Sequence, residues 1–342
     1  MLDHSTLAGV LADLGQPAYR ADQIYRALTR DLATDFADMT TLPRWLRVAL
    51  AARLSVVELD EVQTLADPRD EAAKTLFRSR EDGAAVEGVL MRYPRRATVC
   101  VSSQVGCAVG CAFCASGRLG LRRDLAAEEM VDQVLHFARV LRAEGRQVTN
   151  VVFMGMGEPF HNYDQTLCAC RLLNDPEGFG LAARAISVST VGVVPGIDRF
   201  AAEPLQLNLA VSLHAATDEL RTKLVPLGRT WPLEALFAAC ARYVRRTRRK
   251  LLFEYVVLAG VNDGPDQVAA LGSRLRRPLY HLNLIAFNEP GEIAGAFRRP
   301  SAARLAAFRR TLEAAGVSVT VRRSPGAAIE AACGQLALRS SG

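Results

Sequence analysis

The sequence reads Cys100-Val-Ser-Ser-Gln-Val-Gly-Cys107-Ala-Val-Gly-Cys111-Ala-Phe-Cys114 at the end of its first third. Its last three thiols are spaced C-x3-C-x2-C, and we expect them to lie on one short loop. The apolar run 97–101 before this loop is typical of a strand, and a helical pattern begins near residue 126. Thiolates are soft ligands that suit zinc or iron–sulfur clusters. The spacing therefore predicts a metal centre at the end of a strand.

The kind of metal centre depends on which further ligands the chain offers. A closed structural zinc site needs a fourth protein ligand, usually from a second C-x2-C or an H-x3-H pair. No C-x2-C is formed by the cysteines further along the chain, which are Cys168, Cys170, Cys240 and Cys333. Three thiolates on a 4Fe–4S cluster would instead leave one iron open to a small chelating molecule. Inert buried thiols and a three-cysteine zinc site are the alternatives, and Gly106, Gly110 and Phe113 favour the cluster.

The pattern C-x3-C-x-Phe-C resembles the signature of radical S-adenosylmethionine (SAM) enzymes. The wider run from Cys100 to Cys114 resembles the RlmN/Cfr family of RNA adenine methyltransferases, and the likeness extends over roughly residues 15–340. This resemblance implies two cofactors, SAM and a 4Fe–4S cluster held by Cys107, Cys111 and Cys114. It also implies an α/β fold, a partial (β/α)6 radical SAM barrel with a small N-terminal helical domain.

Length and composition are those of a globular protein. The 342 residues allow two domains, or one large barrel with an appendage, and half of them are apolar. No stretch is apolar enough to span a bilayer, and the N-terminus lacks the regions of a signal peptide, so we expect a cytoplasmic protein. Eight cysteines without a signal indicate a reducing compartment, where clustered thiols bind metals or catalyse. The net charge of +6 favours a polyanionic partner.

Residues 1–66 show helical patterns and are predicted to form an RNA-binding accessory domain. Apolar residues recur at helical spacing over 18–28, and Pro43 fits the first turn of another helix. Five arginines favour RNA contact as a set: Arg20, Arg26, Arg30, Arg44 and Arg47. The resemblance implies a comparable helical domain. Ala66-Asp-Pro-Arg-Asp-Glu is the best linker candidate, and a linking β segment is expected over 67–96.

Over residues 97–342 strands alternate with helices, which predicts a parallel sheet and a barrel that ends in a C-terminal catalytic loop. We expect strands at 97–101, 149–153, 184–190, 206–212, 251–258 and 280–286. Helical patterns lie at 126–142, 163–173, 232–246, 263–276 and 301–315. Six βα units suit a partial barrel that is open on one side.

Unusual residues follow these strands, at the edge where parallel βα folds bind ligands. Gly155-Met-Gly157-Glu158-Pro159 is too short for a dinucleotide fingerprint and would otherwise be a plain turn. The resemblance implies that Gly157 and Glu158 contact the amino group of SAM. It assigns further SAM contacts to Ser189, Ser212, Leu213, His214 and Asn288. After Asn288 the family's usual Asn-Pro is here interrupted by Glu289.

The segment Ala-Ala-Cys333-Gly-Gln-Leu matches the family segment whose cysteine carries a methyl group. The resemblance implies that one SAM methylates Cys333, a step that a lowered thiol pKa would assist. A radical from a second SAM then takes hydrogen from that methyl group, and the carbon adds to adenine. Cys100 removes a proton to release the product. Glu87 would by itself be a solvent-facing carboxylate, and the resemblance makes it a proton acceptor.

The resemblance leaves the target carbon open between two positions. RlmN acts on carbon 2 of an adenosine in the peptidyl transferase centre of 23S rRNA, and often of a tRNA adenosine. Cfr acts on carbon 8 of the same rRNA adenosine and confers ribosomal antibiotic resistance. The runs 157–159 and 91–96 favour carbon 2, whereas 117–121, 248–250 and 279–283 favour carbon 8. We favour carbon 2.

The expected partners are 23S rRNA, tRNA as a further candidate, and an electron donor for the cluster, around a monomeric enzyme. The basic run 242–250 is predicted to contact phosphates. Further arginines that could extend this track are Arg92, Arg95, Arg96, Arg118, Arg122 and Arg123. Pro325 stands where the family commonly has Arg, which is a departure just before the cysteine segment.

Overall fold

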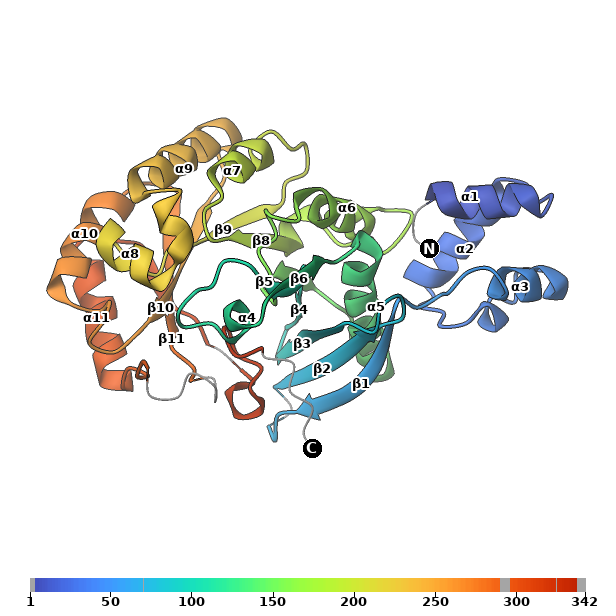
Figure 1. Cartoon of the computed structure of the whole chain (residues 1–342), viewed down its shortest axis with the longest axis horizontal. Helices are drawn as coiled ribbons and strands as arrows, with labels where there is room; N and C mark the ends of the chain where they lie inside the picture. Colours follow the sequence, from blue (N-terminus) through green and yellow to red (C-terminus); the bar gives the residue numbers. More distant parts are fainter. Residues whose placement is uncertain (1–3, 70, 290–295, 324, 337–342) are drawn as a thin grey trace.

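The computed structural model describes residues 4–69, 71–289, 296–323 and 325–336. Its main feature is one curved ten-stranded sheet in the order β1-β2-β3-β4-β7-β8-β9-β10-β11-β12 (Figure 1). Neighbouring strands run antiparallel from β1 to β4 and parallel from β4 to β12. The predicted α/β class, with a partial barrel of parallel strands and a helical N-terminal part, is confirmed.

The parallel strands form the wall of the barrel. They are β4 (Arg96–Val101), β7 (Asn150–Phe153), β8 (Ile186–Thr190), β9 (Asn208–Ser212), β10 (Leu251–Val257), β11 (Tyr280–Ala286) and β12 (Val319–Val321). Most are short apolar runs, because a strand that is covered on both faces has no polar side to alternate with. Six of them lie where the sequence predicted strands. The seventh, β12, was not predicted, because three residues are too few to show a period.

Helices cover the outside of this curved sheet (Figure 1). They are α5 (Ala127–Ala143), α6 (Tyr163–Asn174), α7 (Val194–Phe200), α8 (Asp218–Leu224), α9 (Leu233–Thr247), α10 (Pro265–Leu275) and α11 (Ala302–Ala314). In α9 the buried residues recur at helical spacing, and the basic residues lie on the other face. None of the helices within the described ranges is long and apolar enough to cross a membrane.

The expectation that all of residues 1–66 are helical is wrong for the last eight of them. Residues Leu59–Ala66 form β1, which pairs antiparallel with β2 (Ala72–Ser79), and β3 (Ala85–Tyr93) follows. The predicted linker after Ala66 is therefore the turn of a hairpin. Asp and Pro favour tight turns in hairpins as well as in linkers, so composition alone could not separate the two.

Three helices precede the sheet and project from one end of the molecule (Figure 1). They are α1 (His4–Asp13), α2 (Tyr19–Thr29) and α3 (Arg44–Ala51). Two arginines predicted to contact RNA instead attach α2 to the barrel. Arg26 forms an ion pair with Glu177, and Arg30 donates hydrogen bonds to the carbonyls of Pro176 and Gly178. Surface arginines look alike in sequence whether they face solvent or a neighbouring loop.

A small hairpin presents the cysteine loop. β5 (Gln104–Cys107) pairs with β6 (Gly120–Asp124), and the one-turn helix α4 (Ala115–Arg118) lies between them. Gly106 has a φ of +77°, and a Cβ atom there would lie 1.8 Å from the carbonyl oxygen of Gly120. Only glycine allows β5 to approach β6 this closely, directly beside Cys107.

We therefore predict that Gly106→Ala lowers the free energy of unfolding by at least about 3 kcal/mol, from left-handed strain plus the clash. Gly145→Ala is the matched control, because Gly145 has a φ of +68° with nothing within 4 Å of its virtual Cβ. The control should lose only about 1–2 kcal/mol. Chemical denaturation of the two variants measures the difference, and equal losses would show that the hairpin tolerates the added methyl group.

Candidate active site

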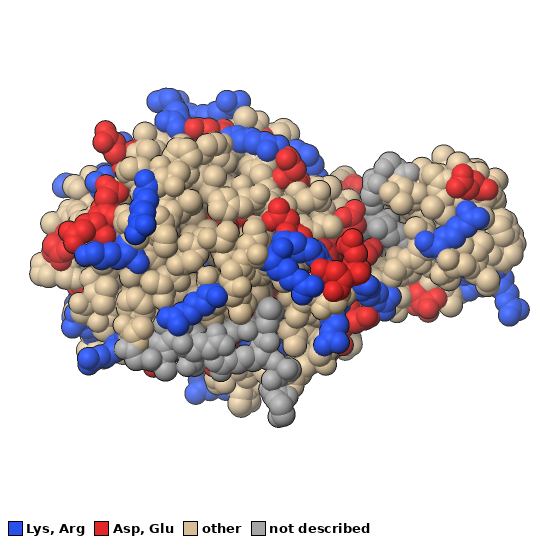
Figure 2. Space-filling view, viewed as in Figure 1, with Lys and Arg blue, Asp and Glu red and all other residues tan. Residues whose placement is uncertain are grey.

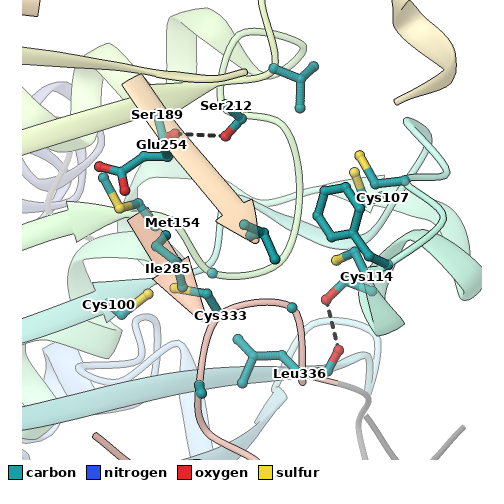
Figure 3. Close-up of a pocket in the computed structure, with 18 of the residues that line it drawn as sticks. Cys100, Cys107, Cys114, Met154, Ser189, Ser212, Glu254, Ile285, Cys333 and Leu336 are labelled. Atoms are coloured by element: carbon teal, nitrogen blue, oxygen red, sulfur yellow. Dashed lines mark hydrogen bonds between the residues drawn. The ribbon is translucent and has the colours of Figure 1, made fainter. Parts of the chain in front are cut away.

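Residues from the barrel strands, the cysteine loop and the C-terminal segment line one cavity. Ten of the thirteen predicted site residues lie in its lining: Cys100, Cys107, Cys111, Cys114, Gly157, Glu158, Ser189, Ser212, His214 and Cys333. Figure 3 shows Cys107 and Cys114 on one side of the cavity and Cys100 and Cys333 on the other. Glu87, Leu213 and Asn288 are not in the lining. Parallel strand ends thus bring together side chains that are far apart in the chain.

The three thiols of the cysteine loop lie close enough to affect one another's charge. Burial raises the pKa of all three, that of Cys107 to about 11, and the nearby thiols raise the pKa of Cys107 and Cys111 further. Phe113 packs edge-on against the ring of His214, with the centroids 4.8 Å apart. The loop is therefore held against the end of β9.

The donor set fits an iron–sulfur cluster. In the described part of the chain, no three His, Cys, Asp or Glu side chains converge on a point where they could hold one metal ion. A 4Fe–4S cluster needs no such convergence, because each thiolate binds a different iron. Cys107, Cys111 and Cys114 would hold the cluster, and no fourth cysteine lies in this loop.

A buried cation, Arg221 of α8, lies beside this loop. Its guanidinium is fully buried and donates hydrogen bonds to the carbonyls of Val191 and Trp231. Burial lowers the pKa of Arg221, and the nearby Cys111 opposes that shift. A buried positive charge at this position would offset the negative charge of bound thiolates. Arg221 could not be predicted from the sequence, because one arginine on a short helix carries no pattern.

Glu158 is buried at the end of β7 with both carboxylate oxygens engaged. Oε1 accepts from the Phe160 N–H at 2.9 Å, and Oε2 accepts from the Val191 N–H at 2.7 Å. Burial raises the pKa of Glu158 to about 7, although these hydrogen bonds favour the ionised form. Gly157 has a φ of +101°, and a Cβ there would lie 2.7 Å from the Gln104 side chain. The turn thus holds a carboxylate rigidly at the cavity wall.

Two serines and one histidine end the next two strands. The hydroxyls of Ser189 and Ser212 are 3.4 Å apart (Figure 3). His214 has a left-handed φ of +57°, and its Nδ1 accepts from the Val256 N–H at 3.1 Å. Burial lowers the pKa of His214 to about 3, so the ring is neutral and its hydrogen is on Nε2. Leu213, between Ser212 and His214, is buried, and its N–H donates to the Glu254 carbonyl at 2.9 Å.

Asn288 follows β11 and is not among the residues that line the cavity. It is buried, and its Oδ1 accepts from Arg299. Its Nδ2 has no hydrogen-bond partner among the described residues, so one donor remains for a ligand or a small movement of the loop. The departure from the family after Asn288 falls partly outside the described residues. Glu289 is inside them, and its carbonyl accepts from Gln335 at 3.0 Å.

Cys100 and Cys333 lie side by side across the cavity from the cysteine loop (Figure 3). Cys100 is the last residue but one of β4 and is buried, whereas Cys333 is partly exposed. Burial raises the pKa of Cys100 to about 12 and also raises the pKa of Cys333. Arg322 opposes both shifts. In this structure, therefore, the pKa of Cys333 is not lowered as its expected role would favour.

Three charged residues of the cavity lining were not predicted from the sequence: Glu254, Arg322 and Arg323. Glu254 lies in the middle of β10 and is buried, and its Oε1 accepts from Asn283 at 2.9 Å. Its Oε2 is 3.7 Å from the guanidinium of Arg322, which follows β12. A single carboxylate in the otherwise apolar run 251–257 was the available signal for Glu254. Arg322 gave none, because β12 itself was not recognised.

Glu87 is not among the residues that line the cavity. It is on the same face of β3 as Val89 and Met91, which line the cavity, but the carboxylate itself is fully buried. Its Oε1 is 3.0 Å from the ammonium group of Lys74 on β2. The solvent-facing alternative for Glu87 is wrong.

Three arginines of the expected basic track have acidic partners within the fold. Arg92 pairs with Glu144, Arg123 with Glu129 and Asp82, and Arg242 with Asp198, all of them closer than 3.1 Å. On the face drawn in Figure 2, Lys and Arg are interspersed with Asp and Glu. These three arginines are committed to internal partners, so a phosphate track would have to use others.

Comparisons with known proteins agree with this geometry. A sequence model described as the radical SAM superfamily matches residues 101–271, and one described as the ribosomal RNA large subunit methyltransferase N-terminal domain matches residues 1–56. A Symbiobacterium thermophilum protein named "Probable dual-specificity RNA methyltransferase RlmN" is 45% identical over 98% of this chain and 89% of its own length. The "Ribosomal RNA large subunit methyltransferase N" of Nitrosopumilus maritimus is 41% identical, over 96% and 94%. The crystal structure of a radical SAM methyltransferase from Sphaerobacter thermophilus has a TM-score of 0.95 and 50% identity, and 98% of each chain is covered.

Proposed function

Because the chain belongs to the RlmN family of radical SAM RNA methyltransferases, we propose that it methylates carbon 2 of an adenosine in 23S rRNA. An adenosine of tRNA is the second proposed target, in keeping with the words "dual-specificity" in the names of relatives. The observation that carries the proposal is that the three thiols of the cysteine loop share one cavity with Cys100 and Cys333. Other chemistry on a radical SAM barrel would not require that second pair of thiols.

The proposed roles follow from where each residue lies. Cys107, Cys111 and Cys114 hold the cluster, which together with SAM supplies the one-electron chemistry that an inert ring carbon requires. Gly157 and Glu158 bind the amino group of SAM. The remaining SAM contacts are assigned to Ser189, Ser212, Leu213, His214 and Asn288.

Cys333 carries the transferred carbon as a thioether, and Cys100 takes the proton from the modified ring. Both roles need the two sulfurs near one adenine, and the shared cavity supports this. The target base must lie in a loop or be flipped out of its helix, because a stacked base cannot enter such a cavity. The proposed setting is a monomer in the reducing cytoplasm, with an electron donor for the cluster.

The N-terminal helices are proposed to contact the RNA. Trp45 and Tyr19 are 54% and 53% exposed, and Arg20 lies 5.1 Å over the Tyr19 ring. Exposed aromatic rings stack on unpaired bases, and arginines bind phosphates. Arg44 is also exposed on α3, next to Trp45. These residues support an RNA contact better than Arg26 and Arg30, which hold the barrel.

We predict that the reconstituted enzyme converts adenosine to 2-methyladenosine in 23S rRNA and in tRNA. Incubation with unmodified RNA, nuclease digestion and mass spectrometry against 2-methyl- and 8-methyladenosine standards measure the product directly. Formation of 8-methyladenosine would replace this proposal with the carbon-8 alternative. Absence of both products, with SAM still cleaved, would point to a different substrate.

Replacing the two thiols should give two different failures. Cys333→Ala should abolish product because no carbon can be carried, whereas Cys100→Ala should accumulate a covalent RNA–protein adduct because the ring proton is not removed. Denaturing gels and mass spectrometry of the RNA-bound protein detect the adduct. Cys168→Ala is the control, because Cys168 is exposed on α6 and outside the cavity lining. An active Cys333→Ala variant would exclude the thioether route.

Binding of SAM should strengthen as pH rises through about 7, the raised pKa of Glu158. Below this pH the carboxylic acid is neutral and cannot pair with the ammonium group of SAM; above it the carboxylate can. Between pH ~6 and pH ~8 the ionised fraction rises about tenfold. Anaerobic calorimetry on the cluster-loaded enzyme should show the Kd falling accordingly, and Glu158→Gln should flatten the profile. A pH-independent Kd for the unsubstituted enzyme would remove Glu158 from this role.

A further inference from the structure

An ion pair between Lys74 and Glu87 is buried between β2 and β3. The ammonium nitrogen is 3.0 Å from Oε1, and the two side chains are 4% and 0% exposed. Removing two charges from water costs several kcal/mol per ion, and their attraction often fails to repay this. The pair is therefore poorly explained as a stabilising contact, and a third partner indicates another purpose.

That third partner belongs to the segment that carries Cys333. The Lys74 ammonium also donates to the carbonyl oxygen of Glu330, at 3.3 Å. Glu330 lies three residues before Cys333, while Lys74 lies 256 residues before Glu330. An ammonium group has three donors, so one lysine can bind a carboxylate and a carbonyl together. The charge of Glu87 fixes the lysine, and the lysine holds the loop.

The loop is shaped to meet β2 at this point. Gly326 has a φ of +83°, and a Cβ there would lie 2.8 Å from the Ala331 side chain and 3.0 Å from Ala72 of β2. The Ala331 N–H donates back to the Gly326 carbonyl at 2.9 Å, which closes the loop. Glu330 itself has a left-handed φ of +51°. A strained backbone conformation persists only where surrounding contacts hold it. The hydrogen bond from Lys74 to the Glu330 carbonyl is such a contact.

The other side of Cys333 is fixed to the cysteine loop. The Ala115 N–H donates to the Gly334 carbonyl, and the Ser116 hydroxyl donates to the Leu336 carbonyl, each at 2.8 Å. Cys333 therefore lies between two anchors, one on β2 and one on α4. Figure 1 shows this segment, in red, between α4 and the strands β2 and β3. Loss of one anchor would let the thiol move away from the cavity while the other remained.

We propose that Lys74 is a positioning residue for Cys333, and that Glu87 acts through Lys74 to hold the thiol over the cavity. The proposal rests on the proposed role of Cys333 as the carrier of the transferred carbon. It also gives a role to Glu87, whose carboxylate is fully buried and is not among the residues that line the cavity.

The test is the double variant Lys74→Met/Glu87→Gln in the cluster-loaded enzyme. It removes both charges and the contact with Glu330 without leaving an unpaired buried charge. The matched control is Lys223→Met/Glu219→Gln, a Lys–Glu pair at 2.7 Å whose side chains are 67% and 82% exposed. Alkylation of Cys333 is followed by peptide mass spectrometry, with the exposed Cys168 as internal reference.

We expect Cys333 of the double variant to be alkylated at least about tenfold faster than in the unsubstituted enzyme, because the loop opens more often. The kcat should fall by about a hundredfold, as for misplaced reacting groups, while the KM for RNA stays within about twofold. The control should match the unsubstituted enzyme. An unchanged alkylation rate in the double variant would overturn the proposal.

Glu87→Gln alone separates positioning from a role as base. The Gln carbonyl oxygen can still accept from Lys74, so positioning predicts near-normal protection of Cys333 and substantial activity. A base role predicts an accumulating RNA adduct with protection intact, and that result would overturn the assignment of Glu87. Alkylation does not depend on turnover. If the unsubstituted enzyme made no methylated RNA, the proposed function would fail while the effect of Lys74 on the loop would still be measured.

Discussion

The proposed chemistry requires that Cys333, near the end of the chain, meet a cluster held by the thiols of residues 107–114. The hydrogen bonds from Ala115 and Ser116 to the carbonyls of Gly334 and Leu336 bring these two segments together. The open side of the sheet is what makes room for them, since a closed barrel would be filled by its own side chains. The cavity is thus built as much by the C-terminal segment as by the strands.

Polar side chains cross the sheet in a row that the strand register fixes. Ser212 of β9, Glu254 of β10, Asn283 of β11 and Thr320 of β12 are paired in turn. Asn283 donates to Glu254 and accepts from Thr320, each at 2.9 Å. A polar layer inside an apolar sheet costs stability unless its members satisfy one another. Here neighbours hold Glu254 at a fixed position in the cavity, which suits a site that must keep its charges in place.

The sequence predicted the elements with a long, regular pattern and the residues within compact motifs. Five barrel helices and six parallel strands have enough apolar periodicity or length to be recognised, and the cysteine loop is contiguous. β12, the strand character of residues 59–66, Arg322 and Lys74 were missed because each depends on a partner distant in sequence. Arg26 and Arg30 show the same limit, because only the fold reveals that they contact Glu177 and its neighbours. For Glu87, the resemblance indicated importance, and the structure was needed to show what the carboxylate touches.

The electrostatics of the cavity place one cation between two thiols and one carboxylate. Arg322 opposes the burial that raises the pKa of Cys100 and of Cys333. The Glu254 carboxylate is 3.7 Å from this guanidinium. At this distance the ion pair is loose, and the positive charge of Arg322 remains available to the two sulfurs. A tight Arg–Glu pair would stabilise the fold more but would leave both thiols without a counter-charge. The Arg322–Glu254 ion pair is therefore weaker than a close pair would be. Because of this, the one arginine can stabilise negative charge on either of the two neighbouring sulfurs.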